Sequence, residues 1–310
     1  MKTASQRFVE FVNRKQLTKT VQVNHPLASY VSIKTGGPAE FFVEPVDLST
    51  LQTIFSFLVE NEIPYKILGN GTNVLISDKG YCGVVISLRK LPQNLSFDDA
   101  TVNCSTNTSV QELLLSLQGR GLSGLEFLNG IPGTVGGCIA MNAGAFGHTI
   151  GEFVNELTII NGNGAKGHLN SNKIMWDYRK TVFPLQDFII LEACFGLKPS
   201  DPQQVAKKMQ EFYHKRTSRK LLAVNTFGSV FKNGSNYYAG SLIEQCGLKG
   251  YHEGDAYISE KHANFIINRG NASSQDVYKL ICTAQKKVKE MFNIELEPEV
   301  HLWGNFDYEE

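Results

Sequence analysis

Residues Leu68-Gly69-Asn70-Gly71-Thr72-Asn73-Val74-Leu75 join the end of one predicted β-strand to the start of another. Apolar runs at 39–43 and 65–68 are typical of strands, and the apolar spacing over 51–58 between them is typical of one helix face. A further strand is expected at 83–88. The sequence therefore predicts a β-α-β unit that ends in a glycine-rich turn.

This Gly-x-Gly turn has two interpretations. Glycines let the backbone approach a ligand closely, so that successive amide hydrogens can point at phosphate oxygens without a lysine. The same pattern is typical of a tight turn between strands, and it is neither a Walker A loop nor a complete Rossmann fingerprint. Both a phosphate-binding loop and a plain turn remain open here.

A second glycine-dense region covers residues 129–137 and 142–147, which read NGIPGTVGG and NAGAFG. Each glycine costs about 0.5–1 kcal/mol compared with alanine in regular structure, so a purely structural region has no reason to contain so many. This density favours contact with a flat or phosphate-bearing ligand.

The remaining pattern indicates an α+β protein. We expect a helix from Ser109 with Gly121 as its stop, strands at 157–160 and 188–195 with an Asn-Gly turn at 163–164 between them, and a helix at 203–215. A last helix starts at the capping box of Ser273 and Asp276 and has a long apolar stripe. The predicted parts are residues 1–91, 92–202 and 203–310.

Three polar segments are ambiguous alone: 228–233 (GSVFKN), 259–265 (SEKHANF) and 296–300 (LEPEV). A strand would put Ser229 and Lys232 on opposite faces, whereas a turn would gather them. His262 alone is more typical of a structural histidine, and the acidic pair around Pro298 of a solvated strand edge.

Charge and cysteine content narrow the function classes. Thirty Lys and Arg residues balance thirty Asp and Glu residues, so no global field favours nucleic acid and any anion must be bound locally. We find no apolar run long enough to span a membrane and no export signal at the start, so we expect no membrane insertion and a cytoplasmic location. The scattered cysteines read as reduced thiols, with Cys138 and Cys194 as core residues, and they predict no metal site. Nothing in the sequence points to an obligate protein partner.

In this order the segments resemble the flavoprotein family of UDP-N-acetylenolpyruvoylglucosamine reductases, which make a peptidoglycan precursor. The resemblance covers nearly the whole chain and is carried by Thr35-Gly36-Gly37-Pro38-Ala39, 68–76 (LGNGTNVLI), 130–137 (GIPGTVGG), 142–147, Tyr178-Arg179, 228–233, 259–265 and 296–300. It implies a two-lobed FAD-binding domain of the vanillyl-alcohol-oxidase type, followed by a smaller α+β substrate-binding domain. A long tyrosine-bearing insertion before Arg179 is missing from the sequence, which resembles the family's shorter second type.

The resemblance also implies roles for particular residues. The catalytic residues would be Arg179, Ser229 and Glu299. The substrate-binding residues would be Tyr178, Lys232, Asn233 and Lys261. The FAD-binding residues would be Gly69, Asn70, Gly71, Thr72, Asn73, Gly130, Ile131, Pro132, Gly133, Thr134, Gly136, Gly137, Asn142, Gly144 and Ala145.

The implied reaction has two halves. NADPH reduces FAD and leaves, and the reduced flavin delivers hydride to the β-carbon of the enolpyruvyl group of UDP-N-acetylglucosamine-enolpyruvate. Arg179 would pair with the substrate carboxylate, Glu299 would polarise its far side, and Ser229 would protonate the α-carbon. The serine alkoxide needs stabilisation, for which Lys232 and the flavin environment are the candidates.

Some positions depart from the family pattern: Lys180-Thr181, Lys220-Leu221-Leu222, Asn225-Thr226-Phe227-Gly228 and His301. They bear on substrate contacts rather than on the three catalytic residues. Two alternatives remain: a sugar or lactone oxidase with the same type of FAD domain, and a flavin- or UDP-sugar-binding protein that has lost turnover. An oxidase should lack GSVFKN and LEPEV, and the three catalytic residues argue against a non-catalytic protein.

Overall fold

The computed structural model describes residues 2–217 and 225–307. The chain forms two compact units: unit 1 comprises Met1–Gln22, Phe42–Gly69 and Val85–Arg216, and unit 2 comprises Val23–Phe41, Asn70–Val84 and Thr217–Glu310. The three consecutive parts expected from the sequence stay a prediction, because the compact units follow a different division of the chain.

The predicted β-α-β unit is present. It consists of β2 (Pro38–Val43), α2 (Leu48–Glu60) and β3 (Tyr65–Leu68), and the further strand is β5 (Tyr81–Ser87). With β1 (Val21–Pro26) these strands form a sheet of order β1-β2-β5-β3. Asp47 caps α2 by accepting hydrogen bonds from the Thr50 amide and hydroxyl, both at 2.8 Å.

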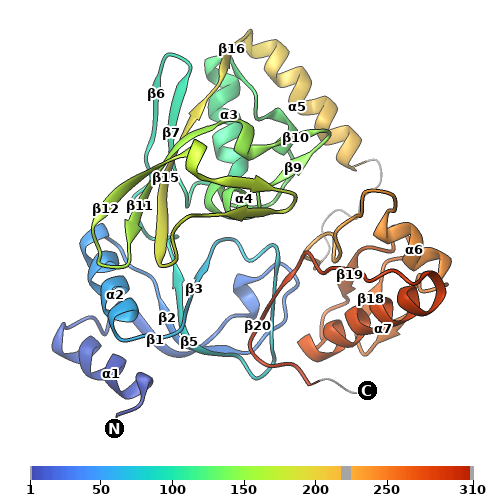
Figure 1. The fold of residues 1–310 in the computed structure, drawn as a ribbon, viewed down its shortest axis with the longest axis horizontal. Helices are drawn as coiled ribbons and strands as arrows, with labels where there is room; N and C mark the ends of the chain where they lie inside the picture. Colours follow the sequence, from blue (N-terminus) through green and yellow to red (C-terminus); the bar gives the residue numbers. More distant parts are fainter. Residues whose placement is uncertain (1, 218–224, 308–310) are drawn as a thin grey trace. The chain divides into compact units, whose positions relative to one another are not determined.

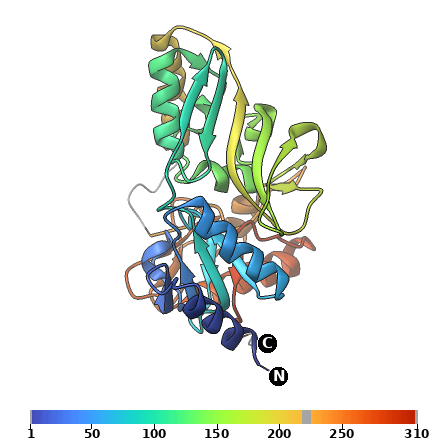
Figure 2. The ribbon, with the colours of Figure 1, turned by 90° about the vertical axis from the view of Figure 1, so that its left-hand side faces the viewer.

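The core of unit 1 lies between α3 (Val110–Arg120) and an antiparallel sheet of order β12-β11-β15-β7-β6. The strands are β6 (Leu95–Asp98), β7 (Thr101–Ser105), β11 (Val154–Asn161), β12 (Lys166–Asn170) and β15 (Phe188–Gly196). Figure 2 shows α3 lying along this sheet, onto which it buries four apolar side chains, worth about 2 kcal/mol each. Ser109 caps the start of α3 and Gly121 ends it at φ +64°, as predicted.

The sequence prediction missed three strands of this sheet, which are β6, β7 and β12. The turn at Asn163-Gly164 connects β11 to β12, rather than leading directly to β15. β12 is short and mostly exposed, because it lies at the sheet edge and buries only Leu169. Its polar composition therefore gave no strand signal.

Unit 1 also contains two longer helices, α1 (Ala4–Arg14) and α5 (Pro202–Thr217). Its remaining elements are short: β8 (Leu122–Ser123), η2 (Glu126–Leu128), α4 (Val135–Ala140), β9 (Gly144–Ala145), β10 (His148–Thr149), η3 (Ile150–Glu152), η4 (Ser171–Lys173), β13 (Met175–Asp177), β14 (Lys180–Val182) and β16 (Lys198–Pro199). Helix α5 agrees with the predicted helix at 203–215, whereas α1 was not predicted.

Unit 2 is built around α7 (Ser274–Phe292), which packs on β17 (His252–Glu253), β18 (Ala256–Ile258), β19 (Ile266–Asn268) and α6 (Ala239–Gln245) (Figure 1). The capping box of Ser273 and Asp276 is present as predicted. The Asp78 carboxylate adds a second cap by accepting from the amides of Ser274 at 2.8 Å and Gln275 at 2.9 Å. Unit 2 also contains η1 (Ala28–Tyr30) and the parallel pair β4 (Val74–Ile76) and β20 (His301–Trp303).

The cysteines are free thiols, as predicted. Cys138 is buried in the core of unit 1, and burial raises its pKa to about 12, whereas Cys194 is only partly buried. No helix in the described part of the chain combines the length and apolar character that crossing a bilayer requires.

Candidate active site

In unit 1, the predicted ligand-binding glycines lie against polar side chains and backbone. Gly69 follows β3, and a Cβ atom there would be 2.8 Å from the Thr134 hydroxyl oxygen. Gly136 lies at the start of α4, and a Cβ there would be 2.8 Å from the Thr106 Cβ. Thr134 caps α4 by accepting from the Gly137 amide at 3.2 Å. Only glycine allows these segments to approach this closely.

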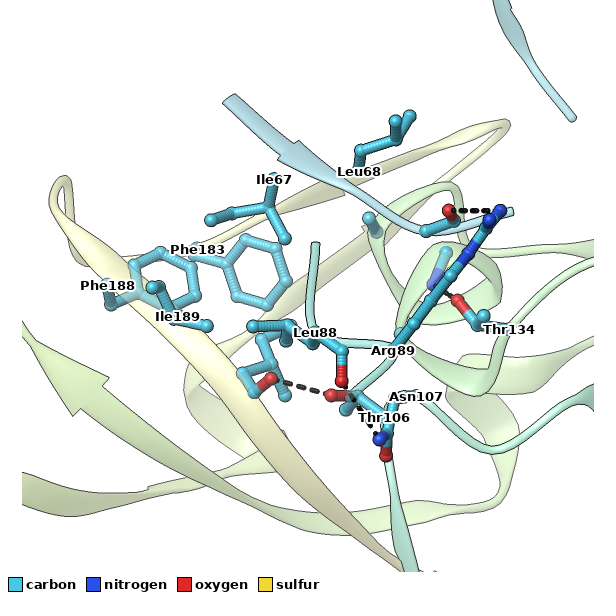
Figure 3. Close-up of a pocket in the computed structure, with 15 residues that line it drawn as sticks. Ile67, Leu68, Leu88, Arg89, Thr106, Asn107, Thr134, Phe183, Phe188 and Ile189 are labelled. Atoms are coloured by element: carbon cyan, nitrogen blue, oxygen red, sulfur yellow. Dashed lines mark hydrogen bonds between the residues drawn. The ribbon is translucent and has the colours of Figure 1, made fainter. Parts of the chain in front are cut away.

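A pocket of about 230 Å³ lies beside these glycines in unit 1 (Figure 3). Its apolar part includes Leu88, Phe183 and Phe188, whose two phenyl rings meet edge to face with centroids 4.8 Å apart. Its polar part includes Arg89 and Thr134. A pocket with one aromatic side and one polar side suits a flat heteroaromatic ring that carries a polar chain.

The GIPG loop is held by Arg216 of α5. The Arg216 guanidinium donates to the carbonyl oxygens of Asn129 and Phe127, both at 2.9 Å. Gly130 has φ +79°, and a Cβ there would be 3.1 Å from the Arg216 Cδ. Burial lowers the pKa of Arg216, and the positive charge of Arg179 lowers it further. Sequence analysis missed Arg216 because it lies in a polar helix outside the glycine motifs.

The predicted catalytic Arg179 is placed by the NAGAFG segment. It occupies the turn between β13 and β14 with φ +55°, a conformation that is uncommon for residues with side chains and is found at functional sites. Its guanidinium donates to the Gly144 carbonyl at 2.7 Å and lies 5.2 Å from the centre of the Tyr178 ring. Asn142 supports the turn by donating to the Asp177 carbonyl at 2.9 Å.

The other residues of the glycine-dense region that were predicted to bind FAD make fewer distinctive contacts. Ile131 and Gly133 are partly buried, Pro132 is exposed, and Ala145 pairs with His148 in the hairpin of β9 and β10. Among the departures from the family pattern, Lys180 is exposed, and Thr181 is buried and donates to the Ile139 carbonyl at 2.5 Å.

In unit 2, the end of the LGNGTN turn supports the predicted catalytic glutamate. The Asn73 side-chain amide donates to the Glu299 carbonyl at 3.0 Å, and the Asn73 carbonyl accepts from the His301 amide at 3.0 Å. Gly71 has φ +60°, and a Cβ there would collide with the Tyr30 carbonyl oxygen. Asn70 and Thr72 are partly buried beside it. The family departure His301 therefore contributes a backbone contact at this point.

Ser229 and Glu299 lie on backbone segments that are hydrogen-bonded to each other. Val230, which follows Ser229, accepts from the Glu299 amide at 2.7 Å. On its other side, the Val230 amide donates to the Asn264 carbonyl at 2.9 Å, and Ser229 forms an isolated bridge with Phe265. The GSVFKN, SEKHANF and LEPEV segments therefore meet, and Ser229 and Glu299 lie near each other within unit 2.

Asn264 holds this arrangement through its side chain. Its amide group accepts from the Phe231 amide at 2.9 Å and donates to the Phe231 carbonyl at 2.8 Å, as a partner strand would. Asn264 is buried, so both hydrogen bonds are shielded from water. The SEKHANF segment was noticed in the sequence, but nothing in it distinguished this asparagine from a surface residue.

The predicted substrate-binding residues of unit 2 are less closely gathered. The Lys232 ammonium pairs with Glu297, the first acid of LEPEV, at 2.6 Å. Asn233 accepts from the Ala239 amide at 3.0 Å at the start of α6. Lys261 is exposed. Of the departures, Phe227 is buried, and Lys220-Leu221-Leu222 lies outside the described residues.

Comparisons with known proteins agree with this description. A model of the FAD binding domain matches residues 39–169, and a model of the C-terminal domain of UDP-N-acetylenolpyruvoylglucosamine reductase matches residues 220–303. The UDP-N-acetylenolpyruvoylglucosamine reductases of Clostridium novyi (strain NT) and Bacillus pumilus (strain SAFR-032) are 38% and 39% identical, over 92% and 91% of this chain and 92% and 93% of their own lengths. The crystal structure of the reductase from Thermus caldophilus matches with a TM-score of 0.78 and 30% identity, over 92% of this chain and 98% of that chain.

The fold and these matches define an FAD-dependent oxidoreductase of α+β class. The chain belongs to the UDP-N-acetylenolpyruvoylglucosamine reductase family, and the fold predicted from the resemblance is confirmed. The residues of unit 1 fit the cofactor, because Gly69, Gly136 and Gly137 line a pocket that has an aromatic side and a polar side.

Proposed function

We propose that the chain reduces UDP-N-acetylglucosamine-enolpyruvate to UDP-N-acetylmuramate with NADPH as the electron donor. The observation that carries this proposal is the hydrogen-bonded pairing of the segments that bear Ser229 and Glu299. Two residues that are 70 positions apart in the sequence thereby lie on paired backbone segments of unit 2. The retention of Arg179 in a conformation uncommon for arginine also supports the proposal.

FAD, when bound, accepts hydride from NADPH and supplies it to the enolpyruvyl double bond. In our proposal FAD is held by the glycine segments of unit 1 that include Gly69, Gly136 and Gly137, with Thr134 and Asn142 among its polar neighbours. Gly69, Gly136 and Gly137 line the pocket of unit 1. The polar wall then offers amide hydrogens to an anionic chain.

Arg179 binds the substrate carboxylate in this proposal. A guanidinium presents two parallel N–H donors that match both carboxylate oxygens, and the bond to the Gly144 carbonyl fixes its direction in advance. Tyr178, beside it, is 48% exposed and therefore accessible to a ligand. Arg216 adds positive charge near Arg179 and strengthens the preference of this wall for anions.

Ser229 donates the proton to the α-carbon, and Glu299 lies nearby to polarise the substrate or position a water molecule. A serine hydroxyl is a weak acid, so the alkoxide that remains needs a partner. Lys232 was the candidate from the sequence, but its ammonium pairs with Glu297 at 2.6 Å. In our proposal Lys232 and Asn233 therefore bind the substrate, together with Lys261, rather than assist the serine.

The first experiment is anaerobic. The protein is loaded with FAD, reduced with NADPH, and mixed with UDP-N-acetylglucosamine-enolpyruvate while the flavin absorbance is followed. We expect prompt reoxidation with formation of UDP-N-acetylmuramate. A flavin that stays reduced until oxygen enters would contradict the proposal and indicate an oxidase or a non-catalytic relative.

We also propose that the enzyme works in the cytoplasm, where its free cysteines remain reduced.

A further inference from the structure

Arg89 is a cationic residue of the unit 1 pocket that no sequence motif includes. It follows β5 and lines the pocket together with Leu88, Gly69 and Thr134. Among the pocket-lining residues in the described ranges, it is the only one whose side chain carries a charge. Its guanidinium donates to the Gly69 carbonyl at 3.3 Å.

The pocket has two chemically different ends. In Figure 3, the side chains of Phe183, Phe188 and Ile189 gather at one end, and Arg89 extends toward Thr134 at the other. The guanidinium reaches the end of β3, where the LGNGTN turn begins. A ligand that fills this pocket therefore meets aromatic rings at one end and a positive charge at the other.

A dinucleotide has this division of character. Its diphosphate carries about two negative charges, yet neither glycine segment contains a lysine or arginine, and the net charge of the chain is zero. Backbone amides bind phosphate through partial charges only, so a nearby arginine would strengthen binding by charge-assisted hydrogen bonds. The bond to the Gly69 carbonyl directs the Arg89 guanidinium toward the glycine segment that begins after β3.

The next residue, Lys90, makes a useful contrast. Its ammonium lies 2.8 Å from the carboxylate of Glu44, whose side chain is only 8% exposed. Lys90 therefore has a structural function, which is to compensate a buried carboxylate. Arg89 points instead into a ligand-sized pocket beside residues that the family resemblance assigns to FAD.

We propose that Arg89 is a further cofactor-binding residue, whose guanidinium pairs with the diphosphate of the bound dinucleotide. This inference rests on the proposed function, because FAD is taken as the occupant. It adds a cation to a site in which the sequence motifs supply only neutral groups.

The test measures binding to the apoprotein rather than turnover. FAD affinity is followed by quenching of flavin fluorescence for the wild type, Arg89→Gln, Arg89→Lys and Arg14→Gln. Arg14 is an exposed arginine on α1, so its variant controls for loss of one positive charge. We expect Arg89→Gln to weaken FAD binding about tenfold or more, Arg89→Lys to weaken it less, and Arg14→Gln to leave it unchanged.

Competition separates a phosphate contact from a change of pocket shape. ADP and adenosine are each used to displace FAD from the wild type and from Arg89→Gln. We expect the variant to lose affinity for ADP but not for adenosine, and the ADP difference to shrink at high salt because screening weakens the charge. Equal losses for ADP and adenosine, or no loss of FAD affinity, would overturn this inference and leave the proposed function intact. A wild-type protein that binds no FAD would overturn both.

Discussion

The glycine-rich wall of unit 1 and the polar cluster of unit 2 are built by opposite means. In unit 1 the positions matter because a side chain is missing: a Cβ on Gly69 or Gly136 would crowd Thr134 or Thr106. In unit 2 the positions matter because a particular side chain is present, as with Ser229 and Glu299. A site that depends on glycines can be recognised from the amino-acid composition of a segment, whereas a site that depends on common polar residues cannot.

The contacts that fix the backbone within each region also differ. The GIPG loop and the Arg179 turn are fixed by arginine side chains that donate to backbone carbonyls at 2.7–2.9 Å. The unit 2 cluster is fixed by backbone pairing and by the amide of Asn264, so these contacts do not require the Ser229 side chain. Removing a side chain should therefore have different consequences in the two regions.

Ser229→Ala has the largest expected effect. Because Ser229 is placed by its backbone, alanine should preserve the fold and NADPH should still reduce the flavin. Reoxidation by the UDP-enolpyruvyl sugar should slow by about 10²–10⁴-fold, the range attributed to one general acid. The two half-reactions are measured separately under anaerobic conditions.

Ser235→Ala is the matched control, because Ser235 is an exposed serine a few residues further along the same segment. It should behave as the wild type in both half-reactions. If Ser229→Ala slows both half-reactions equally, the variant has a folding or cofactor defect and Ser229 is structural. If neither half slows, Ser229 is not the proton donor.

The sequence and the structure agree best where local chemistry decides the outcome. Ser109, Gly121 and the capping box of Ser273 set helix ends through contacts within a few residues, so their positions were predictable. Strands β6, β7 and β12 and helix α1 were not predicted. α1 is a polar-looking segment whose Phe11 stacks on Phe57 at 3.9 Å between ring centroids, a contact that depends on distant sequence.

The candidate site follows the same rule. Glycine density indicated ligand contact from composition alone, and the family resemblance supplied Ser229 and Glu299, which no local pattern distinguishes. Arg89, Arg216 and Asn264 were missed for one physical reason. Each acts on a segment that is distant in sequence: Arg216 on Asn129, for example, or Asn264 on Phe231. Such contacts exist only after the chain has folded.

Two neighbouring glycines in unit 1, Gly136 and Gly137, should show which glycine is needed for packing and which is needed for ligand binding. Gly136→Ala places a Cβ 2.8 Å from the Thr106 Cβ, so packing must shift and unfolding should become easier by about 1–3 kcal/mol. Gly137→Ala meets only the Thr134 hydroxyl oxygen at 3.4 Å, an ordinary contact, and alanine favours the helix by about 0.5–1 kcal/mol. Urea unfolding of the apoproteins measures both.

Titration with FAD then measures cofactor binding by the same two variants. Gly137 is exposed and lines the pocket, so Gly137→Ala should weaken FAD binding although its apoprotein is at least as stable as the wild type. Unchanged FAD affinity would mean that Gly137 is not a ligand-contacting glycine. Full stability in Gly136→Ala would show that the Thr106 segment adapts at little cost.

Asp47 has the smallest expected effect, because its carboxylate caps the start of α2 in unit 1. The hydrogen bonds from the backbone and side chain of Thr50 hold the pKa of Asp47 below its ordinary value of 3.8. A lowered pKa means that the ionised form stabilises the fold above the unfolded pKa, and that this contribution is lost as the pH falls through the folded pKa.

Asp47→Ala should cost about 1 kcal/mol of unfolding free energy at pH 7, as for other helix caps, and progressively less as the pH falls below about 4. Asp47→Asn keeps an acceptor for the Thr50 amide but cannot titrate, so its stability relative to Asp47→Ala should not depend on pH. If the wild type and Asp47→Ala differ equally at pH 7 and at the acid limit, the cap acts through shape rather than through charge, like the glycines beside the pocket.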